Sequence, residues 1–331
     1  MSTTVKTTDL AAILAPIAPD LKALDEVIKR RLASEVALID QISGYIIQSG
    51  GKRVRPALLI LVAKALSSGR EIPHVLDLAA VVEFIHTATL LHDDVVDAST
   101  LRRGRATANE TFGNPASVLV GDFLHTRSFQ MMVETGSMRV MEILSEATNI
   151  IAEGEVLQLM NMHDASLTET DYLKVIRSKT AKLFEASARL GAVLAESTTQ
   201  IEEACATYGQ ALGTAFQIID DVLDYDGNAS EMGKNLGDDL REGKATLPLI
   251  AAMARGAPEQ AQTIRHAIEE GSTEQLAAII DIVKQTGALQ VARQAASDEA
   301  HRAIAAIATL PPTPHSDGMR ALANQLTERR A

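Results

Sequence analysis

The sequence predicts an all-α protein, and three observations support this prediction. Proline, which costs about 3 kcal/mol inside a helix, is absent between Pro115 and Pro248. The same stretch is rich in alanine, leucine, glutamate, methionine and glutamine, which favour helices. Alternating apolar strands joined by tight turns are missing, and Asp226-Gly227 follows a helical pattern instead.

Composition narrows the class of protein further. The chain has 331 residues, of which 46% are apolar and 22% charged, the balance of a globular protein with a large core. Its net charge is −12 and it has no tail rich in lysine or arginine, so nucleic acid is excluded as a main partner. Without repeats or low-complexity linkers, one domain over residues 21–331 is expected after a flexible N-terminus over residues 1–20.

Cysteine usage and hydropathy point to a cytoplasmic protein. Cys205 is the only cysteine, so no intramolecular disulfide can form, and core packing is its expected role. The N-terminus has neither the basic start nor the apolar length of a signal peptide. The apolar runs 57–66 and 78–91 are too short and too interrupted by charge to be transmembrane segments.

The helices can be placed in chain order from apolar spacing and from proline and glycine. Residues 21–49 read as one amphipathic helix, and the glycine-rich segment 50–56 breaks the pattern. Pro56 opens a buried helix over 57–66, where proline is tolerated in the first turn. Pro73 opens the next helix. Further helices are expected near 116–135, 138–161, 169–194 and 200–226, followed by a loop over 227–245 and more helices to about Arg330.

The strongest functional signal lies in residues 83–103, where an apolar helical run carries aspartates. His86, Leu90, Asp93 and Asp97 are spaced by four, three and four residues, so they share one face of the helix. A lone histidine on an apolar helix is typically a core residue, but this one lies on the aspartate face. Both interpretations of His86, core packing and anion contact, therefore stay open.

A second acidic cluster lies in a similar apolar setting. Gln217, Asp220, Asp221 and Asp224 are spaced by three, one and three residues, which places them on one helical face. Solvated acidic faces are the simplest explanation, but both helices are too apolar to be exposed. Buried carboxylates cost several kcal/mol unless they are paired with cations, and Mg²⁺ prefers oxygen ligands with positions left for water and phosphate. The predicted magnesium ligands are Asp93, Asp94, Asp97, Asp220, Asp221 and Asp224.

Basic residues are concentrated beside these aspartates. Lys52, Arg53 and Arg55 follow two glycines, whose backbone lets an anion approach closely. Arg102 and Arg103 follow the first cluster by one to two turns. Further lysines near helix ends and in the later loop are Lys179, Lys182, Lys234 and Lys244. Any one of these alone is typical of a surface charge, but together they predict polyanionic substrates bridged by metal.

These motifs resemble those of the trans-isoprenyl (polyprenyl) diphosphate synthases. Residues 93–97 with the arginines after them resemble the first aspartate-rich motif of that family, and residues 217–224 resemble the second. Residues 50–56 match the early basic motif, while 233–239 and 242–248 match the loop after the second aspartates. The match runs in order from about residue 25 to 310. It implies an isoprenoid synthase bundle with a central pocket, assembled as a homodimer.

The resemblance also implies roles for particular residues. The implied catalytic residues are Asp93, Asp97, Arg102, Lys179 and Asp220. Those implied to contact an allylic diphosphate are Arg102, Lys179, Thr180, Gln217, Lys234 and Lys244. Those implied to bind isopentenyl diphosphate are Lys52, Arg55, His86 and Arg103.

Product length depends, in the family, on the size of residues just before the first aspartate motif. Ala88 and Thr89 are small here, which implies an open elongation tunnel and a long product, around octaprenyl. Met132 and Leu144, on the following helices, are candidates for the tunnel floor.

Three other functions compete with this interpretation. A terpene cyclase or head-to-head synthase would share the fold, but the early basic motif and the aspartate-rich second motif argue against it. A metal phosphohydrolase could be read from His92-Asp93-Asp94, yet it leaves the second aspartates and the cations unexplained. A non-catalytic partner subunit should lack part of the aspartate set, whereas this chain keeps all six.

Overall fold

The computed structural model describes residues 9–48, 51–102, 104–226 and 236–328. It confirms the predicted all-α class, since nearly all regular structure in these ranges is helical. The N-terminal half contains α1 (Leu10–Ile13), η1 (Ala15–Ile17), α2 (Ala18–Leu32), α3 (Ala37–Gln48), α4 (Val54–Leu66), α5 (Val75–Val96), α6 (Ala108–Phe112), α7 (Asn114–Glu134) and α8 (Met138–Met160). The rest contains α9 (Glu169–Ile176), η2 (Arg177–Ala181), α10 (Lys182–Leu194), α11 (Thr199–Asp226), α13 (Asp238–Arg241), α14 (Leu247–Arg255), α15 (Pro258–Glu270), α16 (Leu276–Gln285), α17 (Ala288–Ala306) and α18 (Pro314–Glu328).

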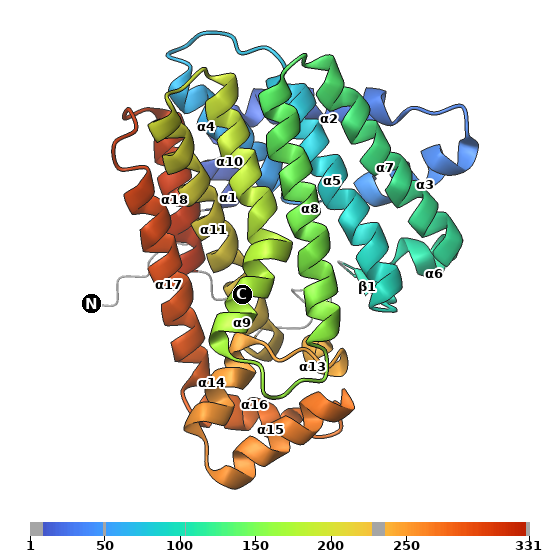
Figure 1. Ribbon diagram of the computed structural model, residues 1–331, viewed down its shortest axis with the longest axis vertical. Helices are drawn as coiled ribbons and strands as arrows, with labels where there is room; N and C mark the ends of the chain where they lie inside the picture. The colour runs from blue at the N-terminus through green and yellow to red at the C-terminus, as the bar shows by residue number, and fades with distance from the viewer. Residues whose placement is uncertain (1–8, 49–50, 103, 227–235, 329–331) are drawn as a thin grey trace.

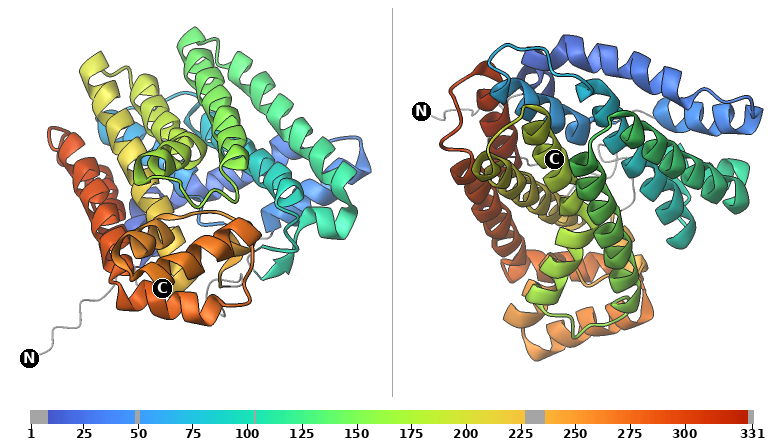
Figure 2. Two further views of the ribbon diagram at one scale, coloured as in Figure 1. Left: turned by 60° about the horizontal axis from the view of Figure 1, so that its bottom comes forward. Right: turned by 45° about the horizontal axis from the view of Figure 1, so that its top comes forward.

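Long helices run along the body of the molecule, and shorter ones close one end (Figure 1). α10 packs against α4, α8 and α11, while α5 packs against α4 and α7. α4 is buried on all sides over Pro56–Ala63, in keeping with its almost wholly apolar sequence. Figure 2 shows α14, α15 and α16 lying across the end of the bundle near which α5 and α11 finish. The aspartate motifs are thus brought to one end of the bundle.

The N-terminal region differs from the prediction. Residues 10–20 were expected to be flexible, but they form α1, η1 and the start of α2, and Ile13, Leu14 and Ile17 are buried. Pro16 and Pro19 begin these helices rather than breaking them, because the first turn of a helix lacks backbone acceptors for its N–H groups. The part of the predicted N-terminus before residue 9 lies outside the described residues.

Two further segments correct the predicted element bounds. The single helix expected over 21–49 is two helices, since residues 33–36 interrupt it between α2 and α3. The helix expected over 169–194 contains a π turn, η2, in its middle. A two-residue antiparallel pair, β1 (Leu101–Arg102) with β2 (Arg105–Ala106), also follows α5.

One helix has the length and hydropathy of a membrane span. Among the described residues this is α5, and 67% of its most apolar window is buried inside the protein. A core helix of a folded domain meets the same criterion, and α5 is covered by α2, α4, α7 and α10. Cys205 is also fully buried, which confirms its predicted packing role.

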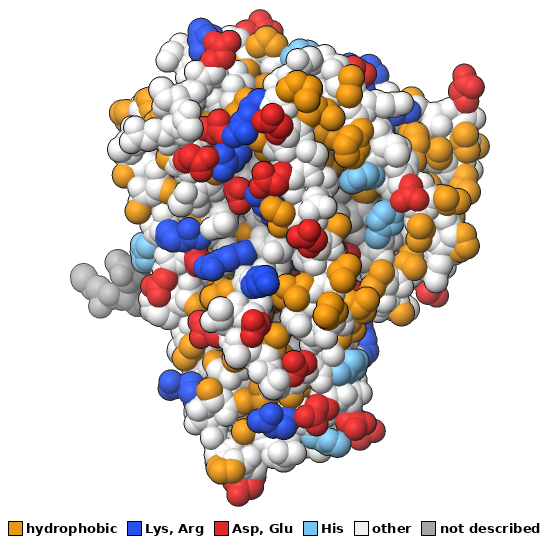
Figure 3. Space-filling view, in the orientation of Figure 1, with side chains coloured by type: hydrophobic (Ala, Val, Ile, Leu, Met, Phe, Trp, Pro, Cys, Tyr) orange, Lys and Arg blue, Asp and Glu red, His pale blue; other side chains and the backbone are white. Residues whose placement is uncertain are grey.

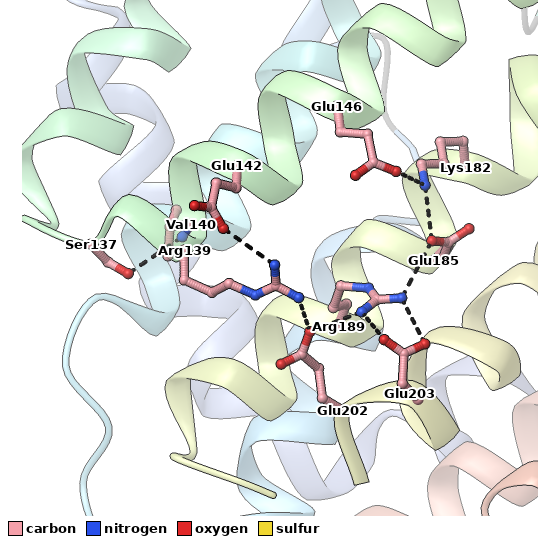
Figure 4. A network of polar contacts seen from close by, with 10 residues as sticks. All are labelled: Ser137, Arg139, Val140, Glu142, Glu146, Lys182, Glu185, Arg189, Glu202 and Glu203. Atoms are coloured by element: carbon pink, nitrogen blue, oxygen red, sulfur yellow. Dashed lines mark hydrogen bonds and ion pairs between the residues drawn. The ribbon is translucent and has the colours of Figure 1, made fainter. Parts of the chain in front are cut away.

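A network of ion pairs joins three helices near the end of the bundle opposite the aspartates. Arg139 of α8 and Arg189 of α10 both contact Glu202 of α11, over 2.5 and 2.8 Å (Figure 4). Lys182 of α10 lies 3.1 Å from Glu146 of α8. These contacts connect the first part of α8 to α10 and α11.

Candidate active site

Asp93 and Asp97 lie at the C-terminal end of α5, where the backbone carbonyls already carry partial negative charge. Two lysines offset this charge. Lys179 Nζ lies 3.6 Å from Asp93 Oδ2, and Lys244 Nζ lies 3.3 Å from Asp97 Oδ2. The structure therefore brings together four residues of the predicted catalytic and substrate-binding sets from three separate segments.

Burial and neighbouring charges shift the pKa values of Asp93 and Lys244 at this end of α5. Burial raises the pKa of Asp93, Lys179 opposes that shift, and the neighbouring Asp97 adds to it. For Lys244, burial lowers the pKa, but Asp97 and Glu242 outweigh burial and leave its pKa above the usual range. The two lysines lie beside carboxylates that repel one another, an arrangement suited to receiving a polyanion with a divalent cation.

Two glutamates hold these lysines in place. Glu155 Oε2 lies 2.6 Å from Lys179 Nζ, and Glu242 Oε2 lies 2.5 Å from Lys244 Nζ. Burial and then Asp93 raise the pKa of Glu155 to about 7, against the lowering effect of Lys179. The sequence interpretation missed both glutamates, because Glu155 lies in no motif and because only Lys244 of the segment 242–248 was assigned a role.

Asp94, next to Asp93 on α5, binds Arg102. Arg102 Nη2 and Nε donate to Asp94 Oδ1 over 2.7 and 2.9 Å, and Asp94 is buried. The β1–β2 hairpin returns the chain so that Arg102 can reach back to α5. Asp94 therefore orients Arg102 in this structure, and the predicted metal contact of Asp94 stays a prediction. Arg103 lies outside the described residues.

The second acidic face is held by neighbours on two other elements. Tyr172 of α9 donates from its hydroxyl to Asp221 Oδ2 over 2.5 Å, and Gln217 Nε2 donates to Asp221 Oδ1 over 2.8 Å. Thr180 Oγ1 donates to Gln217 Oε1 over 2.9 Å. Burial, and after it Asp239, raise the pKa of Asp221 well above its usual range. Asp221 is thus fixed within a buried hydrogen-bond chain.

The other two aspartates of α11 differ in exposure. Asp224 is fully buried and accepts a hydrogen bond from the backbone N–H of Asp239 over 3.3 Å. Asp220 is half-buried on the same helix. Asp239 belongs to the short helix α13, so this contact ties the loop after α11 to the acidic face. Lys234, predicted to contact the allylic substrate, lies outside the described residues.

Arg55 of α4 and His86 of α5, both predicted to bind isopentenyl diphosphate, contact each other. Arg55 Nη1 lies 3.1 Å from His86 Nε2, and because a guanidinium can only donate, Nε2 is the acceptor. The Arg55 guanidinium also stacks 4.4 Å from the ring centre of Phe184. Lys52, three residues before Arg55, is exposed. Arg53 forms an ion pair with Glu83 over 2.5 Å.

The carboxylates at this site fit a magnesium ion that is shared with a diphosphate, rather than one bound by protein side chains alone. Among the described residues, no three carboxylates, imidazoles or thiolates form a metal cluster by themselves. Mg²⁺ commonly keeps several waters and uses one or two carboxylates together with substrate phosphates. Asp93 and Asp97, half-buried and flanked by lysines, suit that mode of binding.

Lys179, Thr180, Gln217, Asp221 and Lys244 line one cavity of about 130 Å³. Its other walls come from α8, α9 and the loop before α14. The four residues predicted to set product length are not among its lining. Ala88, Met132 and Leu144 are buried and Thr89 is half-buried, so the tunnel stays a prediction.

Tyr172 is the residue of this site that sequence reasoning missed most clearly. It lies 49 residues before Asp221 and belongs to no motif. Only the packing of α9 against α11 brings its hydroxyl to the aspartate, so no spacing rule could have found it.

Known proteins resemble this chain over nearly its whole length. Octaprenyl diphosphate synthase of Escherichia coli (strain K12) is 52% identical over 313 residues, covering 94% of this chain and 96% of that protein. The all-trans-nonaprenyl-diphosphate synthase (geranyl-diphosphate specific) of Rhodobacter capsulatus is 46% identical over 299 residues, covering 90% and 91%. A crystal structure of a polyprenyl synthase from Caulobacter crescentus CB15, complexed with calcium and isoprenyl diphosphate, has a TM-score of 0.94 at 44% identity and covers 98% and 99%.

With such relatives and this all-α architecture, the chain is an enzyme of the trans-prenyltransferase class. It belongs to the polyprenyl synthetase family, whose model matches residues 36–285. Enzymes of the family depend on a divalent metal.

Proposed function

We propose that this enzyme extends an allylic diphosphate, farnesyl diphosphate, by successive trans head-to-tail condensations with isopentenyl diphosphate. The proposed product is octaprenyl diphosphate for quinone side chains. The main observation that supports this proposal is the pairing of Asp93 and Asp97 on α5 with Lys179 and Lys244 from distant segments. The 52% identity to the Escherichia coli octaprenyl diphosphate synthase supports this product length.

The proposed chemistry follows from where the cations lie. Mg²⁺ held by Asp93, Asp97 and Asp220 would neutralise negative charge on the departing diphosphate. Lys179 and Lys244 lie at the same place and stabilise charge that grows as the allylic C–O bond breaks. The Caulobacter crescentus structure, which holds calcium and isoprenyl diphosphate, supports a divalent cation in this role.

The remaining residues bind and orient. Arg55 and His86 would hold the diphosphate of isopentenyl diphosphate, so that its double bond faces the allylic carbon. The buried apolar lining around Ala88 would exclude water from the allylic cation. After the new C–C bond forms, a proton is lost to the released diphosphate, and the longer allylic product can react again.

Mass spectrometry of products tests this function. Purified enzyme with farnesyl diphosphate, isopentenyl diphosphate and Mg²⁺ is expected to give octaprenyl diphosphate as the main product. Asp93→Ala is expected to abolish its formation, with Asp40→Ala, a change on α3, as the matched control. Failure of the wild-type enzyme to incorporate isopentenyl diphosphate would refute the proposal, and a folded Asp93→Ala enzyme with full activity would remove the metal assignment.

We also propose a homodimer, formed through the outer faces of α7 and α8. Exposed apolar side chains gather over these helices (Figure 3). They are Leu119, Val133, Met138, Val156, Leu159 and Met160. Exposed apolar patches on folded proteins often mark protein–protein interaction sites. Analytical ultracentrifugation should give twice the 35.4 kDa chain mass, and Leu159→Lys should lower it, whereas a monomeric wild-type protein would contradict this.

A cytoplasmic location is proposed as well. The buried free thiol of Cys205 and the burial of α5 inside the bundle support it. Cell fractionation should recover the enzyme with soluble markers, and recovery only with membranes after a high-salt wash would contradict the proposal.

A further inference from the structure

The π turn η2 (Arg177–Ala181) carries two residues of the site. A π turn contains one more residue than an α-helical turn and is therefore wider, and such turns occur mostly at functional sites. Here the turn aims Lys179 at Asp93 and Thr180 at Gln217. Both contacts depend on how closely the turn approaches the helices on either side of it.

Two glycines on the facing helices make room for this wide turn. A Cβ atom on Gly154 of α8 would lie 2.8 Å from the backbone nitrogen of Lys179 and 2.8 Å from Ser178 Cβ. A Cβ atom on Gly213 of α11 would lie 2.7 Å from Ala181 Cα. These neighbours are backbone or backbone-attached atoms, so a methyl group at either glycine could be accommodated only if the turn moved.

Neither glycine is explained by its own backbone. Both lie inside long helices, where glycine is less favourable than alanine by about 1 kcal/mol. Neither has the positive φ that would require glycine. Close approach of the π turn is therefore the physical reason for glycine at these two positions.

We propose that Gly154 is a positioning residue for the prenyl-transfer reaction. It admits the π turn against α8, so that Lys179 and Thr180 reach the diphosphate of the allylic substrate. This inference rests on the proposed function, which gives those two residues their role. The next residue, Glu155, binds the Lys179 ammonium over 2.6 Å, so neighbouring residues of α8 set both the backbone and the side chain of Lys179.

Ion pairs on both sides of the turn restrict how it can respond to crowding. Arg177 pairs with Glu299 of α17 over 2.7 Å. Lys182, just after the turn, pairs with Glu146 of α8 over 3.1 Å (Figure 4). Because the ends are fastened, the displacement caused by a methyl group at residue 154 would fall on residues 178–180. These are the residues that carry the substrate contacts.

Gly154→Ala tests the proposal, with Gly209→Ala as the matched control. Gly209 of α11 is also crowded, but by the backbone at Phe184 and Glu185, beyond the turn. Gly154→Ala should raise KM for farnesyl diphosphate by about tenfold or more, because small misplacements at a site are costly. KM for isopentenyl diphosphate should change less than about threefold, and calorimetry should show weaker binding of inorganic diphosphate with Mg²⁺.

Gly209→Ala should lower the melting temperature but leave both KM values within about threefold of wild type. If Gly154→Ala does not fold, Gly154→Ala/Ser178→Gly, which removes one of the two close contacts, is measured against the same thresholds. A folded variant with an unchanged KM for farnesyl diphosphate, or an equal rise in Gly209→Ala, would overturn the proposal. Failure of the proposed function is distinct, since the wild-type enzyme would then form no product.

Discussion

Lys244 donates a hydrogen bond to Asp97 over 3.3 Å, although 147 residues separate them in the chain. The contact joins the end of α5 to the loop before α14, so the two halves of the chain meet at the aspartates. Glu242 binds the same ammonium and keeps it in place. The position of Lys244 therefore depends on the fold of both halves.

Lys244→Met should remove this cation while keeping most of the side-chain volume. We expect kcat/KM for the allylic substrate to fall by about 10²-fold, the size of effect typical for loss of one group that stabilises transition-state charge. Steady-state kinetics measure the change. Lys64→Met, which removes the more exposed pair with Asp20, is the control and should leave kinetics unaltered. A fall of less than about threefold would argue against a catalytic role for Lys244.

Tyr172→Phe should remove the hydroxyl that donates to buried Asp221. Leaving a buried acceptor without its donor costs about 1–3 kcal/mol, measured as the free energy of unfolding in urea. Tyr208→Phe is matched, because its buried hydroxyl donates to the carbonyl of Met319 away from the site. Both changes should destabilise, but only Tyr172→Phe should raise the Mg²⁺ concentration needed for half-maximal activity. Equal metal dependence in the two variants would contradict a link between Tyr172 and the acidic face.

Glu155 should make the metal-free enzyme less stable as pH rises. Its pKa is raised from 4.5 to about 7, so between these values the folded protein holds a proton that the unfolded chain has released. Stability is therefore lost as pH rises through this window. In EDTA, the unfolding free energy of the wild-type protein should fall between pH 5 and pH 8. The fall should be about 1–3 kcal/mol smaller in Glu155→Gln, which has no carboxyl group to titrate at this position. Parallel pH profiles for the two proteins would show that Glu155 titrates normally.

Cys205 should be chemically inert in the folded protein. Burial raises the pKa of its thiol to about 12, and the side chain is 0% exposed, so neither thiolate nor access is available at pH 8. Ellman's reagent should label no thiol in the native enzyme and one in guanidinium chloride. Rapid labelling of the native protein would indicate that α11 opens locally.

Ala88→Tyr should shorten the product if the elongation tunnel passes this position. Ala88 is buried on α5 between His86 and the aspartates, so a large ring there would fill the space needed by the growing chain. Mass spectrometry should show the main product shifted to fewer isoprene units, while Ala79→Ser, on the same helix two turns earlier, should not shift it. An unchanged product would remove the tunnel assignment for Ala88.

Local patterns of the sequence predicted much of this site. The two acidic faces follow from residues three and four apart on helices, and that geometry does not depend on the rest of the fold. Arg55 and His86, which the family resemblance relates to the same substrate, isopentenyl diphosphate, lie in contact in the structure. The first helices were less predictable, because Pro16 and Pro19 look like breaks in the sequence but begin helices in the structure.

Contacts between distant segments were beyond the reach of such patterns. Nothing near Tyr172 in sequence indicates that its hydroxyl meets Asp221, because the contact exists only after α9 packs on α11. The contact of Asp94 with Arg102 likewise depends on the return of the β1–β2 hairpin to α5, which the motif spacing does not reveal.

The π turn also alters how the helix that contains it can be read. One additional residue rotates everything after it by about 100° relative to a continuous α-helix. By regular helical spacing, Tyr172, Val175 and Ile176 before the turn and Leu183, Ser187 and Leu190 after it would share one face. The π turn therefore makes α9 and α10 bury these residues in different directions. Because the turn accommodates one extra residue, deleting one residue from 177–181 would restore a regular helix and leave the directions of both faces unchanged, but it would remove the wide turn that presents Lys179 and Thr180 to the site.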